Sequence, residues 1–336
     1  MDNNEPLIVE TFRSESANGV PVSVLKSAIQ KYARRKMLSE GLAVLGLCSY
    51  FTATRITTNI VNRLVVIMSE EINIHETMVP VLMMQLHQRY ASGKDPSVWL
   101  EMYTLLCRSR KCRLVSDVKT RWNLPPYKME LSRLDQLHKV LLQQHGIKTG
   151  QVDRTETGDP GRVVANFEKG LDARDWDVTF TALRVILRQP TPPRGFEKDL
   201  WKTVQAAAER ADTRLTPVIT ALKYFHGKMK HAERPIYLIH AVLLILHAPA
   251  LGYESPLNCA VPETLNHWRK EGVSLALRSF PDFVIDRHTT LARGQSAVTF
   301  AEVGAYIPDE DKRFMSNELR SMYLEFKHLQ EGKSGP

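Results

Sequence analysis

The chain has 336 residues and carries 45 lysines and arginines against 37 acidic residues, a formal net charge of +8. Hydrophobic residues make up 43% and charged residues 24%, as in an ordinary globular protein that buries a core without metal or disulfide staples. This length predicts two or three domains. The polar, acidic start excludes a signal peptide, and the longest apolar run, residues 236–251, is too short and too polar to span a bilayer.

Apolar spacing predicts helices along most of the chain, after a polar segment at residues 1–20 that we expect to be flexible. The Asp95-Pro96 pair is a strong start signal, because aspartate caps helices and proline favours their first position. In the first half we expect helices at about residues 24–36, 38–50, 57–72, 77–90 and 96–106, and one marked by Leu131, Leu134, Leu137, Val140 and Leu141 and ended by Gly146.

Residues 146–162 are the clearest linker, because they are rich in Gly, Thr and Asp and nearly devoid of large apolar side chains. They separate a helical domain expected at 21–145 from a second one expected at 163–279. The second domain should contain helices at about 163–188 and 197–211, and two more that start at Thr216-Pro217 and at Pro235. Residues 280–336 are expected to form a tail with an extended stretch and a final helix at about 309–330.

The two halves have the pattern of an internal duplication. Thr216-Pro217-Val218 follows Val79-Pro80-Val81 at an offset of 137 residues (217 − 80), and Glu168-Lys169 follows Gln30-Lys31 at an offset of 138 (168 − 30). Because identity between the halves is low, this is a hypothesis about topology. The expected fold class is therefore all-α, with two helical bundles related by a possible duplication and a partly extended C-terminal tail.

The segment Asn62–Asn73 is the most informative part of the first half. Its apolar residues share one helical face, while Arg63 lies near the start and Glu70 and Glu71 near the end, against the helix dipole. Charges placed in this way usually have partners elsewhere. We therefore expect Arg63, Glu70 and Glu71 to hold the helical module together or to pair across subunits; the alternative is a core helix with solvated charges.

Neighbouring stretches give this helix a family resemblance. Leu25–Arg35 and Gly41–Leu45 precede it, and Leu100–Leu106 follows it and runs into Cys107-Arg108-Ser109-Arg110-Lys111. This order resembles the C-terminal helical region of the MgsA/RarA family of replication-associated recombination proteins, over about residues 22–121, with Ser69-Glu70-Glu71-Ile72 as its most specific element.

Members of that family are AAA+ ATPases that act at replication forks. This chain contains neither G-x-x-x-x-G-K-[ST] nor G-x-G-x-x-G, so it offers no backbone cradle for the phosphates of ATP. The resemblance therefore implies the non-catalytic part of the family, which is tied to oligomerisation and DNA contacts, and does not imply ATP hydrolysis.

Two segments concentrate positive charge. The first, residues 108–121, is opposed only by Asp117, and we predict phosphate contacts from its cations: Arg108, Arg110, Lys111, Arg113, Lys119 and Arg121. The alternative is a solvated helix end, where cations also favour the dipole. The second is opposed only by Glu233 and contains Lys223, His226, Lys228, Lys230, His231 and Arg234. We expect no aromatic stacking surface there, so any nucleic-acid contact would be to phosphates and sensitive to salt.

No motif indicates a metal site, a cofactor or a catalytic centre. The cysteines Cys48, Cys107, Cys112 and Cys259 form no C-x-x-C pair and are expected to be reduced, and neither H-E-x-x-H nor G-x-S-x-G occurs. In a strand, Asp286 and His288 would share one face, either as an acid/base pair or as a hydrogen bond that anchors the tail. The segment around them loosely resembles the tails of uncharacterised proteins of large DNA viruses.

These observations predict a non-enzymatic, DNA-associated accessory protein, of a large DNA virus, with an oligomerising helical module and a basic surface that contacts phosphates. The alternative is a structural or assembly protein, such as a virion component or scaffold, that binds other proteins. A weaker alternative is an enzyme that uses Asp286 and His288. We expect a homo-oligomer or assembly without membrane contact, inside the host cytoplasm or nucleus or in the virion.

Overall fold

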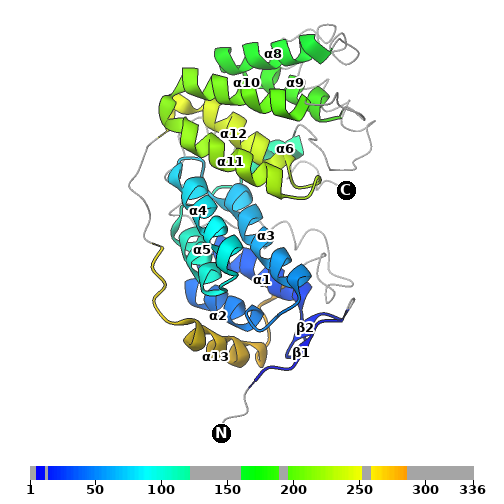
Figure 1. Cartoon of the computed structure of the whole chain (residues 1–336), viewed down its shortest axis with the longest axis vertical. Helices are drawn as coiled ribbons and strands as arrows, with labels where there is room; N and C mark the ends of the chain where they lie inside the picture. Colours follow the sequence, from blue (N-terminus) through cyan, green and yellow to red (C-terminus); the bar gives the residue numbers. More distant parts are fainter. Residues whose placement is uncertain (1–4, 12–13, 122–159, 189–195, 252–258, 286–336) are drawn as a thin grey trace, which may run out of the picture. The chain divides into compact units, whose positions relative to one another are not determined.

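The fold is all-α, with one small sheet in the described residues, and the helices form two compact units (Figure 1). The computed structural model describes residues 5–11, 14–121, 160–188, 196–251 and 259–285. Of these, the first unit comprises the residues up to Cys112 together with 259–285, and the second runs from Arg113 to Leu251. The predicted fold class is confirmed. The predicted helix at 131–141 and the tail from residue 286 lie outside the described residues.

The first unit begins with helices whose boundaries follow the apolar spacing closely. They are α1 (Val22–Arg34), α2 (Leu38–Cys48), α3 (Thr54–Glu71), α4 (Met78–Gly93) and α5 (Ser97–Arg108). Helix α1 packs on α2, α3 and α5, and α4 packs on α3 and α5. Asp95 accepts a hydrogen bond from the backbone nitrogen of Ser97 at 2.8 Å, as expected of a cap at the start of α5.

A three-stranded antiparallel sheet precedes α1, formed by β1 (Ile8–Val9), β2 (Ser16–Ala17) and β3 (Val20–Pro21). Just after β1, the Glu10 carboxylate accepts hydrogen bonds from the backbone nitrogens of Thr52 (2.6 Å) and Ala53 (2.8 Å), at the start of α3. Burial acts to raise the pKa of Glu10, but these bonds and the charge of Arg55 outweigh it and lower the pKa. The described part of residues 1–20, which we predicted as a flexible segment, thus contains strands and contacts the start of α3; its flexibility stays a prediction.

Helix α13 (Leu265–Ala276) completes the first unit, although it follows the second unit in the sequence. It packs along α2 (Figure 1), at a separation that only glycine permits. A Cβ atom on Gly46 would lie 2.1 Å from the Trp268 carbonyl oxygen, and one on Gly272 would lie 2.3 Å from the Ala43 carbonyl oxygen. The predicted second domain at 163–279 is therefore wrong at its end, because residues 259–279 belong to the first unit.

Side-chain contacts hold the end of residues 259–285 against α1. The short helix η4 (Asp282–Val284) places the Phe283 ring edge-on to the Tyr32 ring, with centroids 5.9 Å apart. Ser27 donates a hydrogen bond of 2.7 Å to the Val284 carbonyl oxygen. Residues 280–285, which we predicted as the start of a tail, are thus part of the first unit.

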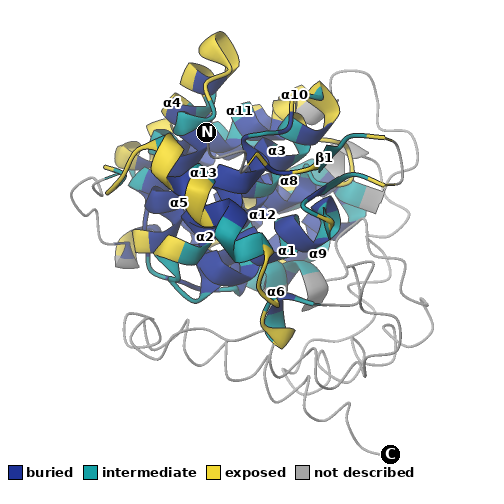
Figure 2. Ribbon diagram, turned by 90° about the horizontal axis from the view of Figure 1, so that it is seen from below, coloured by how far each residue is buried: buried dark blue, intermediate teal, exposed yellow. Residues whose placement is uncertain are grey.

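The second unit surrounds one apolar helix. Its elements are α6 (Leu114–Arg121), α8 (Pro160–Ala173), α9 (Trp176–Arg188), α10 (Phe196–Ala211), η2 (Thr213–Leu215), α11 (Thr216–Lys228), α12 (Pro235–Leu246) and η3 (Ala248–Ala250). Every residue of α12 is buried, because α6, α8, α10 and α11 pack around it. Figure 2 colours the described residues by burial. Since α6 packs here, the predicted first domain at 21–145 is wrong from Arg113 onward in the described residues.

The stretch predicted as a single helix at 163–188 forms two helices. Arg174 adopts a φ of 54°, in the left-handed region, and separates α8 from α9. The predicted linker at 146–162 falls outside the described residues up to 159, and its last three residues begin α8.

Helices follow one another in the same order in both units, and matching helices are separated by a nearly constant number of residues. Helices α8, α9, α11 and α12 begin at 160, 176, 216 and 235, each 138 residues after the starts of α1, α2, α4 and α5 at 22, 38, 78 and 97. Lys36 and Arg174, also 138 apart, both have a left-handed φ, Lys36 between α1 and α2 and Arg174 between α8 and α9. The packing pairs α1/α2, α3/α4, α4/α5 and α3/α5 recur as α8/α9, α10/α11, α11/α12 and α10/α12. The units are therefore structural repeats, as the sequence offsets predicted.

His240, buried in the middle of α12, should give the protein a defined pH dependence. Burial lowers its pKa from 6.5 to about 4. Between these values the unfolded chain binds a proton that the folded chain does not, so stability is lost as the pH falls through this window. We expect a loss of about 3 kcal/mol between pH 7 and pH 4 from this group. Urea unfolding at a series of pH values measures it.

The control for this prediction is His240→Met, which removes the titrating group from the same apolar surroundings. The difference in unfolding free energy between the wild type and this variant should change with pH between about 6.5 and 4 and be flat above that range. A difference that does not change with pH would contradict the neutral, buried state of His240.

Candidate functional site

Charged and amide side chains of α1 and α3 form a polar cluster inside the first unit. The Arg34 guanidinium donates to both carboxylate oxygens of Glu71, with 2.8 Å between Nε and Oε2. These two side chains are 5% and 1% exposed. Gln30 Nε2 donates to Glu71 Oε1 at 2.8 Å and to Glu70 Oε2 at 3.2 Å. Gln30 Oε1 accepts a bond of 3.2 Å from Arg63. We call these five side chains the α1–α3 polar cluster.

The cluster explains charges that run against the helix dipole. Glu71 is the last residue of α3, where the dipole disfavours a carboxylate, and the guanidinium of Arg34 compensates for it. The hydrogen bonds of Arg63, Glu70 and Glu71 described above join α1 to α3, which fits the first of the two predicted roles, that of holding the module together. Pairing across subunits stays a prediction.

Lys111 lies in the middle of the predicted phosphate-contact segment, yet it is fully buried. Its ammonium donates to the backbone carbonyls of Leu106 (2.5 Å), Cys107 (3.2 Å) and Ser109 (2.6 Å), at the end of α5. Carbonyls in the last turn of a helix have no partner within the helix, so Lys111 caps α5. A β-bridge between Lys111 and Ile72 holds the backbone in place. The prediction that Lys111 contacts phosphate is wrong, because a phosphate does not reach a fully buried ammonium.

The other cations of residues 108–121 are divided between the two units. Arg110 donates from Nε to Glu76 Oε1 at 2.7 Å, and this ion pair is only 16% and 6% exposed. Arg108 is exposed at the end of α5, in the first unit. The second unit holds the half-buried Arg113 and Lys119, and Arg121, whose side chain lies outside the described residues. Phosphate contact by residues other than Lys111 stays a prediction.

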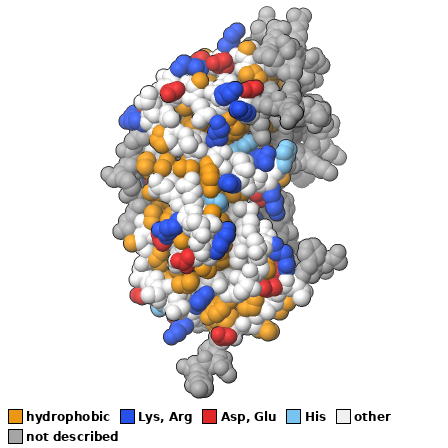
Figure 3. All heavy atoms as spheres, viewed as in Figure 1, with side chains coloured by type: hydrophobic (Ala, Val, Ile, Leu, Met, Phe, Trp, Pro, Cys, Tyr) orange, Lys and Arg blue, Asp and Glu red, His pale blue; other side chains and the backbone are white. Residues whose placement is uncertain are grey.

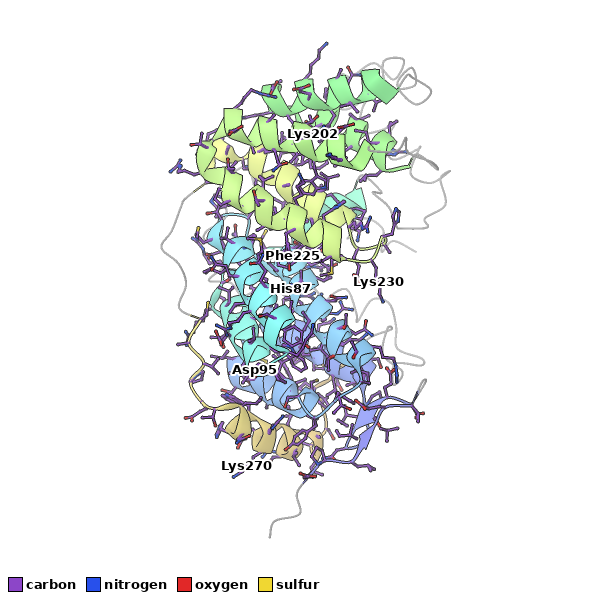
Figure 4. All side chains as sticks on the ribbon, in the orientation of Figure 1. His87, Asp95, Lys202, Phe225, Lys230 and Lys270 are labelled. Atoms are coloured by element: carbon purple, nitrogen blue, oxygen red, sulfur yellow. The ribbon has the colours of Figure 1, made fainter. Side chains whose placement is uncertain are left out.

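The last residue of α11 and the turn that follows it expose three basic side chains. Lys228, Lys230 and His231 are all exposed, and the one acidic residue among positions 223–234, Glu233, is half-buried. We call these three residues the α11 basic turn. Figure 4 labels Lys230 within it. On the face drawn in Figure 3, lysine and arginine side chains are otherwise spread over both units.

Other cations of the second basic segment are engaged elsewhere. Lys223 Nζ donates to Gln205 Oε1 at 2.8 Å. His226 is buried, with its ring edge-on to the Trp201 ring at a centroid distance of 5.2 Å. Arg234 is half-buried and donates from Nε to the Met229 carbonyl oxygen at 3.1 Å.

Tyr224 adds an aromatic ring to this surface, which the sequence analysis missed. It is half-buried and lies one helical turn before Lys228, whose Nζ is 5.5 Å from the ring centroid. The next residue, Phe225, is fully buried (labelled in Figure 4). The four-residue interval from Thr220 through Tyr224 to Lys228 was the available signal, because it places all three on one helix face.

The cysteines offer no reactive thiol in the described structure. Cys48, Cys107 and Cys112 are buried and Cys259 is half-buried, all without a disulfide. Burial raises the pKa of Cys107 to about 11, so its thiol stays protonated at neutral pH and is a weak nucleophile. Asp286 and His288 lie outside the described residues.

Within the described ranges, no three His, Cys, Asp or Glu side chains come together as metal ligands would. None of the helices that the structure describes is both long and apolar enough to cross a membrane. No protein-family model, no curated protein and no solved structure matches the chain.

Proposed function

We propose that this protein is a non-enzymatic, nucleic-acid-associated accessory protein that contacts phosphates through the α11 basic turn. The observation that carries the proposal is the exposure of Lys228, Lys230 and His231 within four residues at the end of α11 and just after it, where the one acidic residue nearby, Glu233, is half-buried. Cations gathered in this way attract a phosphate backbone and release its counterions. The helix dipole accounts for a cation in the last turn of α11, but not for Lys230 and His231, which lie beyond the end of the helix.

The rest of the chain supports a binding role in which the helical units act as rigid supports. The net charge of +8 favours association with polyanions. The resemblance of residues 22–121 to the helical region of the MgsA/RarA family fits a role beside DNA without ATP hydrolysis. In this proposal the α1–α3 polar cluster stabilises the first unit, and the second unit presents the phosphate contacts.

Salt-dependent binding tests this proposal. We expect labelled DNA to bind in a fluorescence-anisotropy titration, with an affinity that falls steeply as salt is raised. The Lys228→Glu/Lys230→Glu variant should bind roughly tenfold more weakly at low salt and reduce the slope of log affinity against log salt by about two, since two phosphate contacts are removed.

The matched control is Lys198→Glu/Lys202→Glu, which reverses two exposed charges on α10 of the same unit. It should weaken binding much less. Equal losses in both variants would contradict a localised contact at the α11 basic turn. Absence of DNA binding at low salt, together with self-assembly or binding of another protein, would overturn the proposal in favour of an assembly protein.

A further inference from the structure

One face of α11 carries an aromatic ring, an exposed glycine and a lysine. Thr220, Tyr224 and Lys228 recur at four-residue intervals, and Gly227 lies beside them on the same face. Thr220, Gly227 and Lys228 are exposed and Tyr224 is half-buried. Because Phe225 fills the core position next to it, Tyr224 is not needed to fill the interior of the second unit.

Gly227 has no packing role in this structure. A Cβ atom built on it would meet nothing within 4 Å. Glycine within a helix is less favourable than alanine, because it gives up more backbone freedom on folding. A glycine kept on an exposed helix face with open space above it therefore fits a surface that another backbone approaches closely.

The ring and the neighbouring cation are already arranged as a pair. Lys228 Nζ lies 5.5 Å from the Tyr224 centroid, within the range of a cation–π contact. Lys230 and His231 continue the positive charge past the end of the helix. A base that stacks on Tyr224 would thus have its flanking phosphates within the field of these cations. Aromatic rings beside cations are the usual platform for unpaired bases.

We propose that the α11 face binds a single-stranded nucleic acid, with one base stacked on Tyr224, the backbone passing over Gly227 and the phosphates beside Lys228 and Lys230. This inference rests on the proposed function and adds the class of ligand to it. A duplex keeps its bases stacked on one another, so it uses the cations but not the ring. The protein should therefore prefer a single strand to a duplex of the same length.

The test compares ring variants of the full-length protein with two probes, a short oligothymidylate and a duplex of equal length. Tyr224→Leu should bind the single strand roughly tenfold more weakly, because a base loses its stacking partner. Tyr224→Phe keeps the ring and should bind like the wild type. Neither variant should change duplex binding. Unfolding midpoints measured in urea should stay close to that of the wild type, which separates a lost contact from a lost fold.

Gly227→Leu tests the close approach of the backbone. It should weaken oligothymidylate binding without lowering stability, because the added side chain meets open space in the free protein. Gly93→Leu is the matched control: Gly93 also lies exposed at the end of a helix, α4, with nothing within 4 Å of a built Cβ atom. It should bind like the wild type.

The outcomes separate this inference from the proposed function. If the wild type binds the single strand and Tyr224→Leu binds it equally well, stacking on Tyr224 is refuted while phosphate binding survives. If binding of both probes depends only on Lys228 and Lys230, the same conclusion holds. If the wild type binds neither probe at low salt, the proposed function itself fails.

Discussion

Replacing Glu71 with alanine is expected to destabilise the protein by about 3–5 kcal/mol, because it leaves a buried charge without its partner. The Arg34 side chain is 5% exposed, so its guanidinium cannot turn to water when the carboxylate is removed. Gln30 would also lose the acceptor that its Nε2 contacts at 2.8 Å. Urea unfolding should show a lower midpoint with an unchanged slope.

Two further variants give this prediction its controls. Arg34→Met/Glu71→Leu removes both charges and fills the space with apolar side chains, so it should recover most of the loss. Glu101→Ala breaks the ion pair with Arg89, whose side chain is 52% exposed, and should cost less than about 1 kcal/mol. An equally small cost for Glu71→Ala would contradict the buried ion pair between α1 and α3.

Alanine at Gly46 or at Gly272 is expected to push α2 and α13 apart. The added methyl carbon would lie 2.1 Å from the Trp268 carbonyl oxygen in the first variant and 2.3 Å from the Ala43 carbonyl oxygen in the second. Both obstacles are backbone atoms, so a rotamer change cannot relieve them. We expect each variant to lose about 3 kcal/mol, the upper part of the range for overpacking.

Thermal unfolding and native-state proteolysis measure the effect. Because α13 covers α2, its separation should expose the α13 segment to proteases before the rest of the first unit unfolds. Gly93→Ala is the control, since a methyl there meets nothing within 4 Å and should leave stability equal or slightly raised. Wild-type stability of Gly46→Ala would contradict the close packing of these two helices.

Local signals in the sequence sufficed for most helices, because each depends on neighbouring residues. The apolar period set the positions of α2 and α3, and Asp95 and Pro235 marked helix starts to within two residues. Helix α13 was missed although Thr264 caps its start, because only Trp268, Gly272 and Val273 in it are buried and its apolar pattern is therefore sparse. Its partner α2 lies more than 200 residues away in the sequence, so no local pattern could assign it to the first unit.

The candidate site was less accessible to sequence reasoning, because burial depends on distant partners. Nothing in Arg110-Lys111-Cys112-Arg113 separates the buried Lys111 from its neighbours. What buries it is the bridge to Ile72, in a segment 39 residues earlier (111 − 72). Likewise, Tyr224 and Phe225 are adjacent aromatic residues, and only the packing of α11 shows which of them faces the core.

Because α13 packs on α2 but follows the second unit in the sequence, the first unit is completed only late in synthesis. Helix α2 leaves the ribosome long before α13, so its apolar surface waits for roughly ten to forty seconds at ordinary rates of translation. The described elements of the second unit are continuous in the sequence, so all of them are synthesised during that time. The first unit still lacks residues 259–285 at that point. A nascent chain stalled before residue 259 would therefore present α2 to chaperones, and the emergence of α13 would decide when the first unit closes.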